Sequence, residues 1–352
     1  MKVLQLGPYP PPNGGVQTHI AALVGFLRRS GVTCDVLNLN RFRRPSAEGI
    51  FYPSNSVEVL AHLLSHRYDV IHLHIGGRIF LRQLGLAIAC SALPKTHCVL
   101  TFHSGGYPSS EEGRSAHARS LRAFALRRFD RIIAVNSEIA AFFERLRVPP
   151  EHISLISPHA PPSVTTPSKL PLELEKFFSD HQPLLITVSL LEPEYDLALQ
   201  IEAMKRVREK WPNAGLLIAG SGSLHETLRQ QIDNELYAPH VLLYGDLPHA
   251  ATLRAITRAD VMLRTTWYDG DALSVREALH FGLPVIATDN GMRPQGLRLI
   301  PPRDLEALLA AINEVLQFPS PKRNQSTTMT ADQGNLRTVF DLYRELAARS
   351  TG

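Results

Sequence analysis

The chain alternates short apolar segments with amphipathic segments, and this alternation runs through the sequence twice. In the first half the apolar segments each have the length of one buried strand: "KVLQL", "VTCDVLNL", "YDVIHLH", "CVLTFHS" and "RIIAVN". Segments with helical periodicity separate them, such as "VQTHIAALVGFLRRSG", in which Gly31 ends the helix. Strands that alternate with helices predict a parallel sheet covered by helices on both faces.

The pattern starts again after a linker. Residues 157–171 are rich in Pro, Ser and Thr and show no periodicity, which is typical of a linker. Strand-like segments then alternate with helical ones once more: "PLLITVSL", "AGLLIAG", "HVLLYG", "DVMLR" and "LPVIAT". A last helical segment, "LRTVFDLYRELAAR", is far enough along the chain to fold back against the first domain.

These patterns predict an α/β protein with two doubly wound, Rossmann-like domains that face each other across a cleft. A chain of 352 residues is also longer than one hydrophobic core usually fills. We expect a first domain at residues 1–165, a linker at 166–182, a second domain at 183–330 and a C-terminal helix at 331–352. Because open α/β sheets bind ligands at the carboxyl ends of their strands, the site should lie there.

The composition is that of a soluble globular protein, with 44% hydrophobic and 20% charged residues. No apolar run has the roughly eighteen residues of a membrane span, and the N-terminus lacks the pattern of a signal peptide. The three cysteines, Cys34, Cys90 and Cys98, have no metal-ligand spacing and are odd in number. We therefore expect a cytoplasmic protein with reduced core cysteines.

Positive charge is concentrated in the first half. Residues 1–167 hold 18 Lys and Arg against 10 Asp and Glu, and the rest of the chain holds 19 against 23. The clusters are "RFRRP" at 41–45 and Arg119, Arg122, Arg127, Arg128 and Arg131. They indicate either contact with anionic lipid or a phosphorylated substrate, or only a solvated face. Peripheral attachment to the inner face of a membrane is thus one expectation, and no nucleic-acid partner is expected.

Two glycine motifs follow strand-like segments. Gly14 and Gly15 lie between the first strand and its helix, where backbone amides can approach an anion, although packing alone can also require glycine there. "AGSGSLHETL" resembles a dinucleotide-binding loop, but His225 occupies the third glycine position. A nicotinamide site is therefore disfavoured.

Three histidines lie at the ends of predicted strands. His72 and His74 point to one face of a strand near its carboxyl end, which would suit a metal, but no third ligand is evident. A cleft-lining or structural role is favoured for both. His103 directly follows a strand and precedes "GG", so its imidazole can reach a hydroxyl or a phosphate.

Asp269, Asp271 and Glu277 are three acids within nine positions, just after a predicted strand. Two carboxylates at i and i+2 can chelate a divalent ion, but no further acidic cluster completes a metal site. The favoured interpretation has Asp269 accepting hydrogen bonds from sugar hydroxyls while amides at the following helix start bind anionic oxygens. Glu277, inside that helix, can hold a ribose diol. We expect no metal and no cofactor.

In this order, these motifs resemble a family-4 retaining glycosyltransferase of the GT-B fold. The resemblance covers nearly the whole chain, and its most specific part is "YDGDALSVREALHFGLPVIATDNG". It implies that Asp269 and Glu277 bind the donor sugar and the nucleotide ribose, that Gly15 lies near the diphosphate and that His103 contacts the transferring sugar. Further donor-binding positions are expected at Gly14, Gly222, Leu247, Arg264, Gly270, Asp271, Ala272, Leu273, Ser274 and Arg276.

The sequence departs from the family pattern in two places. Asp269 stands where the family usually has a glutamate. The family also usually carries an arginine and a lysine that grip the donor diphosphate, but "TVSLLEPEYD" offers Ser189, Leu190 and Tyr195 instead. Losing two charge-assisted hydrogen bonds costs about 1.5–3 kcal/mol each. The candidates that would compensate are Arg264, Arg276 and Arg293.

The resemblance implies metal-independent transfer of a sugar, with retention, from a nucleotide diphosphate sugar to a glycan, lipid-linked or small-molecule acceptor. No carboxylate is placed as a nucleophile, so we expect attack from the face of the leaving group. Two alternatives stay open: a nucleotide-sugar epimerase of the same fold, and a binding or scaffold protein that has lost catalysis. The missing cations favour the second alternative, and the retained Asp269 and Glu277 disfavour it.

Overall fold

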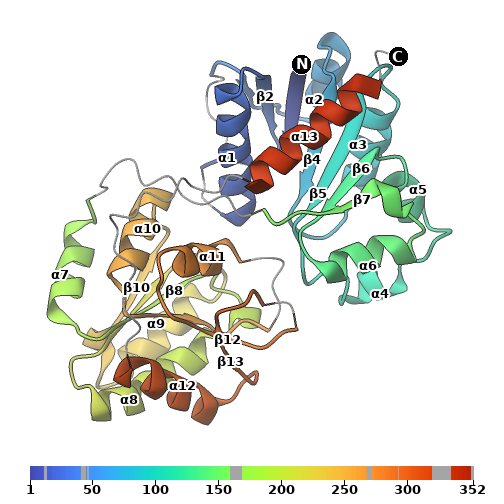
Figure 1. Cartoon of the computed structure of the whole chain (residues 1–352). Coiled ribbons are helices and arrows are strands. Elements are labelled where there is room, and N and C mark those ends of the chain that lie inside the picture. Colours follow the sequence, from blue (N-terminus) through green and yellow to red (C-terminus); the bar gives the residue numbers. More distant parts are fainter. Residues whose placement is uncertain are drawn as a thin grey trace. The chain divides into compact units, whose positions relative to one another are not determined.

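The computed structural model describes residues 1–11, 14–40, 45, 47–158, 169–267, 272–291, 293–318 and 334–349. The chain divides into two compact units. Unit 1 contains residues 1–160 and 332–352, and unit 2 contains residues 161–331 (Figure 1). Each unit has its own parallel sheet and its own hydrophobic core, so each is described by itself.

Unit 1 is built on a seven-stranded parallel sheet with the order β3-β2-β1-β4-β5-β6-β7. Its strands are β1 (Lys2–Gly7), β2 (Thr33–Asn38), β3 (Ile50–Phe51), β4 (Val70–Ile75), β5 (His97–Phe102), β6 (Arg131–Ala134) and β7 (Ile153–Leu155). Strand order reverses between β1 and β4, and such a reversal opens a crevice at the carboxyl ends of the strands.

Helices cover both faces of this sheet. In chain order they are α1 (Gly15–Arg29), α2 (Ser56–Ser65), α3 (Leu81–Ser91), α4 (Glu111–Ser115), α5 (Leu121–Leu126) and α6 (Ser137–Arg145). Asn55, Ser120 and Asn136 cap the starts of α2, α5 and α6, because each side-chain oxygen accepts a backbone N–H of the first turn. These caps explain why the helices begin where they do.

The C-terminal helix α13 (Gly334–Arg349) belongs to unit 1 and crosses its sheet beside α1 (Figure 1). It buries the apolar side chains Leu336, Val339, Leu342 and Leu346 in the core that also contains Ile20, Leu23 and Val70. The ion pair between Arg131 and Glu345, at 2.9 Å, ties the helix to β6. The prediction of a last helix that returns to the first domain is confirmed.

Unit 2 repeats the architecture with a six-stranded parallel sheet, order β10-β9-β8-β11-β12-β13, which reverses between β8 and β11. Its strands are β8 (Leu184–Val188), β9 (Gly215–Ala219), β10 (Val241–Gly245), β11 (Val261–Arg264), β12 (Val285–Thr288) and β13 (Arg298–Ile300). Its helices are α7 (Leu172–Asp180), α8 (Leu197–Lys210), α9 (His225–Asp233), α10 (His249–Arg258), α11 (Leu273–His280) and α12 (Leu305–Gln317). Helix α7 lies in the range 166–182, where a linker was expected.

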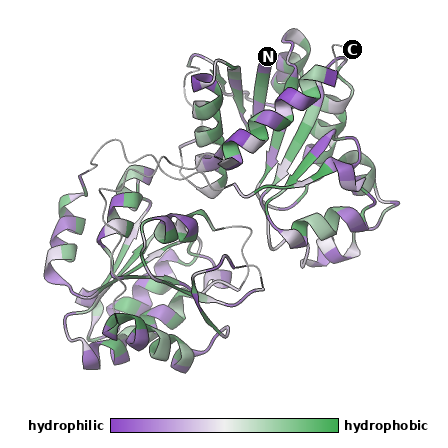
Figure 2. Cartoon of the chain, in the orientation of Figure 1, coloured by the Kyte–Doolittle hydropathy of each residue, from purple (hydrophilic) through white to green (hydrophobic). Residues whose placement is uncertain are grey.

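The hydropathy of the chain follows this architecture. Figure 2 shows the strands of both sheets mainly in green, while hydrophilic residues in purple lie along the helices. Cys34, Cys90 and Cys98 are buried and unpaired, as predicted. Among the described residues, no helix is both long and apolar enough to cross a membrane. The prediction of two doubly wound α/β domains is confirmed.

Candidate active site

In unit 1, polar side chains gather where the strand order reverses. The face of β1, β4 and β5 that packs under α1 and α13 begins with Val3, Val70 and Val99. Further along the same face, the strands present Gln5, His72, His74 and Thr101, and all four are buried. The carboxyl edge of an otherwise apolar sheet is therefore lined by hydrogen-bonding groups.

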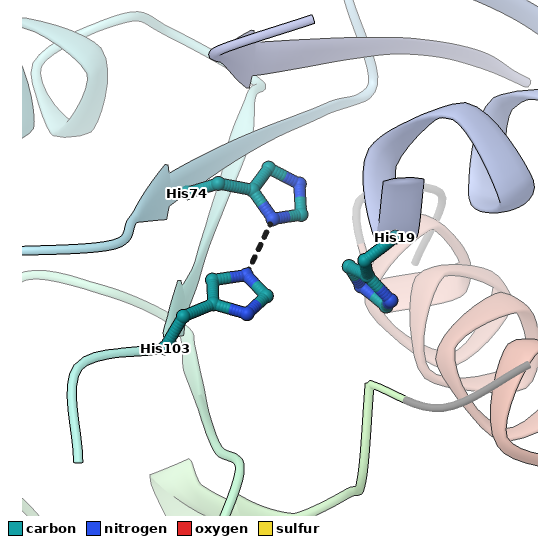
Figure 3. A group of neighbouring side chains, drawn as sticks. All are labelled: His19, His74 and His103. Atoms are coloured by element: carbon teal, nitrogen blue, oxygen red, sulfur yellow. Dashed lines mark hydrogen bonds between the residues drawn. The ribbon is translucent and has the colours of Figure 1, made fainter. Parts of the chain in front are cut away.

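Three imidazoles meet at this edge: His19 from α1, His74 from β4 and His103 from the residue after β5 (Figure 3). His74 Nδ1 and His103 Nε2 are 3.3 Å apart, and the His19 ring lies edge-on to His103 with 5.3 Å between centroids. His19 Nδ1 is 2.8 Å from the carbonyl oxygen of Pro158. His74 and His103 were predicted at this edge from the sequence, whereas His19 was not, because its position is an ordinary interior one in an amphipathic helix.

Burial keeps these imidazoles neutral. Desolvation lowers the pKa of His19 to about 4, although its bond to the Pro158 carbonyl opposes the shift. Desolvation also lowers the pKa of His72, His74 and His103 well below the ordinary value, and the neighbouring imidazoles add to the effect. Neutral imidazoles carry one donor and one acceptor nitrogen, so the site offers lone pairs rather than positive charge.

The same cluster is the group in the described part of the chain that could hold a metal ion. One nitrogen from each of His19, His74 and His103 lies within 4.8 Å of the others, and neutral imidazole is a common ligand of transition metals. His72 cannot join them, because its Nδ1 contacts the Tyr343 hydroxyl and its Nε2 lies 2.7 Å from Thr101 Oγ1. The third histidine that the sequence did not reveal comes from α1.

Helix α1 begins beside this edge. Gly14 is its N-cap and has no side-chain cap, so the first amides of α1 are not satisfied by a capping side chain. Among the described residues, a Cβ on Gly15 would meet nothing within 4 Å, whereas the three atoms nearest to a Cβ on Gly14 belong to the end of the Gln17 side chain. The space next to Gly15 is therefore open, as an approaching ligand requires.

In unit 2, the corresponding edge lies at the carboxyl ends of β8 and β11. The carbonyl oxygen of Val188 accepts Arg264 Nη1 at 2.9 Å and the Ser274 hydroxyl at 3.3 Å. Arg264 is buried, and its guanidinium lies 5.0 Å from the Tyr195 ring centroid. Arg293 donates to the carbonyls of Thr288 and Thr266, at 2.9 and 3.1 Å. Both cations therefore lie at the carboxyl edge of this sheet.

Glu277 lies on α11 and is only 3% exposed. Its Oε1 is 2.6 Å from Nε2 of His249, the first residue of α10. Burying a carboxylate is costly unless it has hydrogen-bond partners, and His249 supplies one for Glu277. Glu277 was predicted as a site residue from the sequence, but His249 was not, because it lies 28 residues earlier and no local sequence pattern distinguishes it.

Other predicted residues of unit 2 have different surroundings. Asp269, Gly270 and Asp271 lie outside the described residues. Ala272 is the N-cap of α11, Leu273 is its first residue, and Arg276 is partly buried in its second turn. Leu247 packs in the core of the unit. A Cβ on Gly222 would come within 2.5 Å of the Leu191 carbonyl oxygen, so this glycine is needed for close packing of two backbone segments.

Several arginines of the predicted basic cluster bond to other residues of unit 1. Arg122 donates to the Glu112 carbonyl, Arg127 to the carbonyls of Ala118 and Leu146, and Arg131 pairs with Glu345. Arg41, Arg43 and Arg44 lie outside the described residues. Arg122, Arg127 and Arg131 thus join segments of unit 1 to one another.

Two family models match the chain in succession. "Glycosyltransferase Family 4" matches residues 13–162, and "Glycosyl transferases group 1" matches residues 173–330. The chain belongs to the family-4 glycosyltransferases. The family resemblance predicted from the sequence is therefore confirmed, and so are the two Rossmann-like domains of the GT-B fold.

The curated relatives are distant. A GDP-mannose-dependent alpha-(1-6)-phosphatidylinositol monomannoside mannosyltransferase of Mycobacterium tuberculosis is 24% identical, with 88% of this chain and 87% of the relative aligned. The glycogen synthase of the same species is 28% identical over 45% of this chain. That match spans only 39% of the synthase, and the match to a Mycolicibacterium smegmatis mannosyltransferase spans 47% of that relative.

Solved structures share the fold over the full chain. Sucrose-phosphate synthase from Thermosynechococcus elongatus has a TM-score of 0.74 at 17% identity, with 99% of this chain and 100% of that chain covered. The Anabaena protein HepE, in complex with UDP-glucose, has a TM-score of 0.65 at 16% identity, with 100% and 98% covered. At such low identity, these likenesses show the fold alone.

Proposed function

We propose that this family-4 glycosyltransferase transfers a sugar from a nucleotide diphosphate sugar to a glycan, lipid-linked or small-molecule acceptor, with retention at the anomeric carbon. The observation that carries the proposal is the buried Glu277 carboxylate, held by His249 in unit 2. A fixed carboxylate in a dry environment is suited to accept hydrogen bonds from a diol such as that of ribose. The names of the relatives support this class of donor, since they include GDP-mannose-dependent transferases and a UDP-glucose complex.

The leaving nucleoside diphosphate carries negative charge that must be stabilised as the sugar departs. In this chain Arg264 and Arg293 place positive charge at the carboxyl edge of the second sheet, and α11, whose start has no side-chain cap, is the next helix after β11. Preorganised cations and amides of this kind stabilise a developing anion without a metal ion. We therefore propose metal-independent transfer in which these groups replace the absent arginine and lysine.

The proposed retention is consistent with the residues at the carboxyl edge of unit 1. Among the described side chains that meet there, the polar groups are Gln5, Thr101 and imidazoles, and none is a carboxylate. A double displacement would need such a nucleophile. Attack from the face of the leaving group needs none, so we propose that route. His103, which contacts the transferring sugar in this proposal, would orient that sugar.

Thermal stability in the presence of nucleotide sugars tests the proposal most directly. Ligands that bind the native state raise the melting temperature, so a panel of UDP- and GDP-sugars, with and without magnesium, identifies donor and metal dependence together. We expect one donor to raise the melting temperature. This increase should not depend on magnesium and should be lost in Glu277→Ala. Product analysis by NMR should then show the anomeric configuration of the donor in the glycoside.

One observation favours a second candidate, a binding or scaffold protein without catalysis. The segment after β8 offers the partly buried Ser189 and the 54% exposed Leu190 where the family usually has a cation. Donor binding without turnover, in the presence of a panel of glycan and lipid acceptors, would support this candidate. Isomerisation of the donor sugar with no acceptor present would indicate an epimerase instead.

An acceptor at a membrane surface is a further part of the proposal. It rests on the excess of Lys and Arg in the first half of the chain. Co-sedimentation with liposomes that contain anionic lipid, at low and high salt, tests it. Retention of the protein only at low salt is expected, and equal binding to neutral liposomes would contradict the role of charge.

A further inference from the structure

A buried chain of hydrogen bonds joins the C-terminal helix to the site histidine of unit 1. Gln5 Nε2 lies 3.2 Å from the Tyr343 hydroxyl oxygen, and Gln5 Oε1 lies 2.8 Å from His74 Nε2. His74 Nδ1 in turn lies 3.3 Å from His103 Nε2 (Figure 3). Tyr343, Gln5 and His74 are all buried, so these groups have one another rather than water as partners.

The orientation of the Gln5 amide sets the direction of each hydrogen bond in this chain. The Gln5 amide nitrogen can only donate, so the Tyr343 oxygen accepts from it and the Tyr343 hydrogen points to His72 Nδ1. The Gln5 amide oxygen can only accept, so neutral His74 carries its hydrogen on Nε2. His74 Nδ1 is then a lone pair, and the bond to His103 must be donated by His103 Nε2–H.

This polarity determines what His103 offers to a ligand. With its one hydrogen on Nε2, neutral His103 has a lone pair on Nδ1, and in the part of the chain that the structure describes Nδ1 has no hydrogen-bond partner. His103 is also the most exposed of the three clustered imidazoles. A ligand group that meets Nδ1 must therefore donate a hydrogen, as a hydroxyl does and as an ionised carboxylate or phosphate oxygen does not.

We propose that Tyr343 and Gln5 are positioning residues that fix His103 as a hydrogen-bond acceptor, so that this part of the site selects a ligand hydroxyl over an anionic oxygen. The functional part of this inference rests on the proposed function, because it takes His103 to contact the transferring sugar. The structural part does not depend on it. If the Gln5 amide were reversed, every bond in the chain would reverse, and His103 would present an Nδ1–H donor instead.

Nitrogen-15 NMR of protein labelled at histidine tests the polarity without any substrate. The two neutral tautomers have distinct ring-nitrogen shifts, and His74→Ala and His103→Ala assign the signals. We expect hydrogen on Nε2 of both His74 and His103. Hydrogen on Nδ1 of either residue would overturn the proposal, whether or not the protein binds a nucleotide sugar.

Tyr343→Phe tests the role of the helix. It removes the hydroxyl that accepts from Gln5 and keeps the aromatic ring, so the His103 signals should become a mixture of tautomers. Tyr107→Phe is the matched control, because Tyr107 is also buried in unit 1 but its hydroxyl has no hydrogen-bond partner among the described residues. Unchanged His103 signals in Tyr343→Phe would remove Tyr343 from the proposal.

Monofluorinated nucleotide sugars test the selected ligand group. Fluorine accepts a hydrogen bond weakly and cannot donate one, so the analogue fluorinated at the contacted hydroxyl should bind the wild-type protein about tenfold more weakly than its parent. This penalty should disappear in His103→Ala and shrink in Tyr343→Phe, while Tyr107→Phe retains it. Fluorination penalties that are identical in wild type and His103→Ala at every position would contradict the selection of a hydroxyl.

Discussion

His249 Nε2 lies 2.6 Å from Oε1 of Glu277, and this contact joins the first residue of α10 to the buried face of α11. Glu277 is almost fully buried, whereas the His249 side chain is one-third exposed. Glu277 thus lies in the interior of unit 2 and contacts a histidine that reaches the surface of that unit. This relation gives the proposed ribose contact a structural basis that the position of Glu277 in the sequence alone did not supply.

We expect Glu277→Gln to bind the nucleotide sugar ten- to a hundredfold more weakly, because one charge-assisted hydrogen bond contributes about 1.5–3 kcal/mol. Isothermal calorimetry with the donor identified by thermal shift measures this loss. Glu314→Gln is a suitable control, since Glu314 forms an exposed ion pair with Arg298 on the same unit. Equal affinities of wild type and Glu277→Gln would remove Glu277 from the donor site.

His249→Ala should lower the free energy of unfolding by about 1–3 kcal/mol, because it leaves a buried carboxylate without this partner. Urea unfolding followed by the fluorescence of Trp211 and Trp267 reports on unit 2, which contains both tryptophans. The double variant His249→Ala with Glu277→Gln should recover part of the loss. No recovery would show that His249 stabilises the unit by packing rather than through Glu277.

Unit 1 should lose stability as the pH falls below neutral. The pKa of His19 is about 4 in the folded protein and 6.5 ordinarily, so between these values the unfolded chain binds a proton that the folded chain does not. The contribution of His19 to the free energy of unfolding is therefore fully present above about pH 7. At pH 5 this contribution is lower by about 2 kcal/mol. His72, His74 and His103 act in the same direction.

Hydrogen–deuterium exchange at pH 7.5 and pH 5 measures this effect, after correction for the intrinsic pH dependence of exchange. Peptides from β4 and β5 should lose protection at the lower pH, and peptides from β8 and β9 serve as the internal control. The variant His19→Leu should show a smaller change. Equal loss of protection in both units would contradict a cause in the histidine cluster.

A chelator should leave the transferase activity unchanged, and added zinc should inhibit it. Three neutral imidazoles can ligate zinc after small side-chain rotations, which would replace the bond between His74 and His103. Calorimetry should show about one zinc ion bound per chain and none in His19→Ala. The control His225→Ala removes an exposed histidine of unit 2. Zinc binding that survives in His19→Ala would mean that the ion lies elsewhere.

Gly15→Ala should change donor affinity without lowering the melting temperature of the protein. A methyl group there meets no atom of the described residues within 4 Å, and alanine is a better helix former than glycine by up to about 1 kcal/mol, so the melting temperature should stay equal or rise. Donor affinity should fall several-fold if the diphosphate approaches the start of α1.

In contrast, Gly220→Ala should destabilise unit 2 severely, because its Cβ would lie 1.8 Å from the Ser189 carbonyl oxygen at a φ of +144°.

The strands that were predicted correctly are the interior strands of the two sheets and the edge strand β10. Most of the interior strands are runs of apolar residues buried on both faces, such as β4 or β9, and β10 is also a five-residue, mainly apolar run, so each carries a hydrophobic signal. The strands β3, β7 and β13 were not predicted. They have only two or three residues at the edges of their sheets, and all of these residues except Ile300 are partly or fully exposed, so they carry no such signal.

A site residue could be predicted from the sequence when its position in one strand or helix determines where it lies. It could not be predicted when its place depends on how two elements pack together. His103 and Glu277 could be placed because a strand end and a helix position define them. His249 and His19 come from helices that begin beside the site, and only the packing of those helices brings them to their partners. Gln5 offered a hint, as a polar residue inside an apolar strand, but its partner Tyr343 is 338 positions away.

The return of α13 to unit 1 has a consequence for the order in which the protein acquires its structure. During synthesis, residues 161–331 are complete before α13 emerges, so unit 2 can fold while one face of the unit 1 sheet still lacks this cover. Unit 1, whose first 160 residues are synthesised first, is thus the last to acquire its complete fold. Since Tyr343 is on that helix, the hydrogen-bond chain to His103 closes only once this late segment has docked, and a chain broken off before it would hold both sheets without that closure.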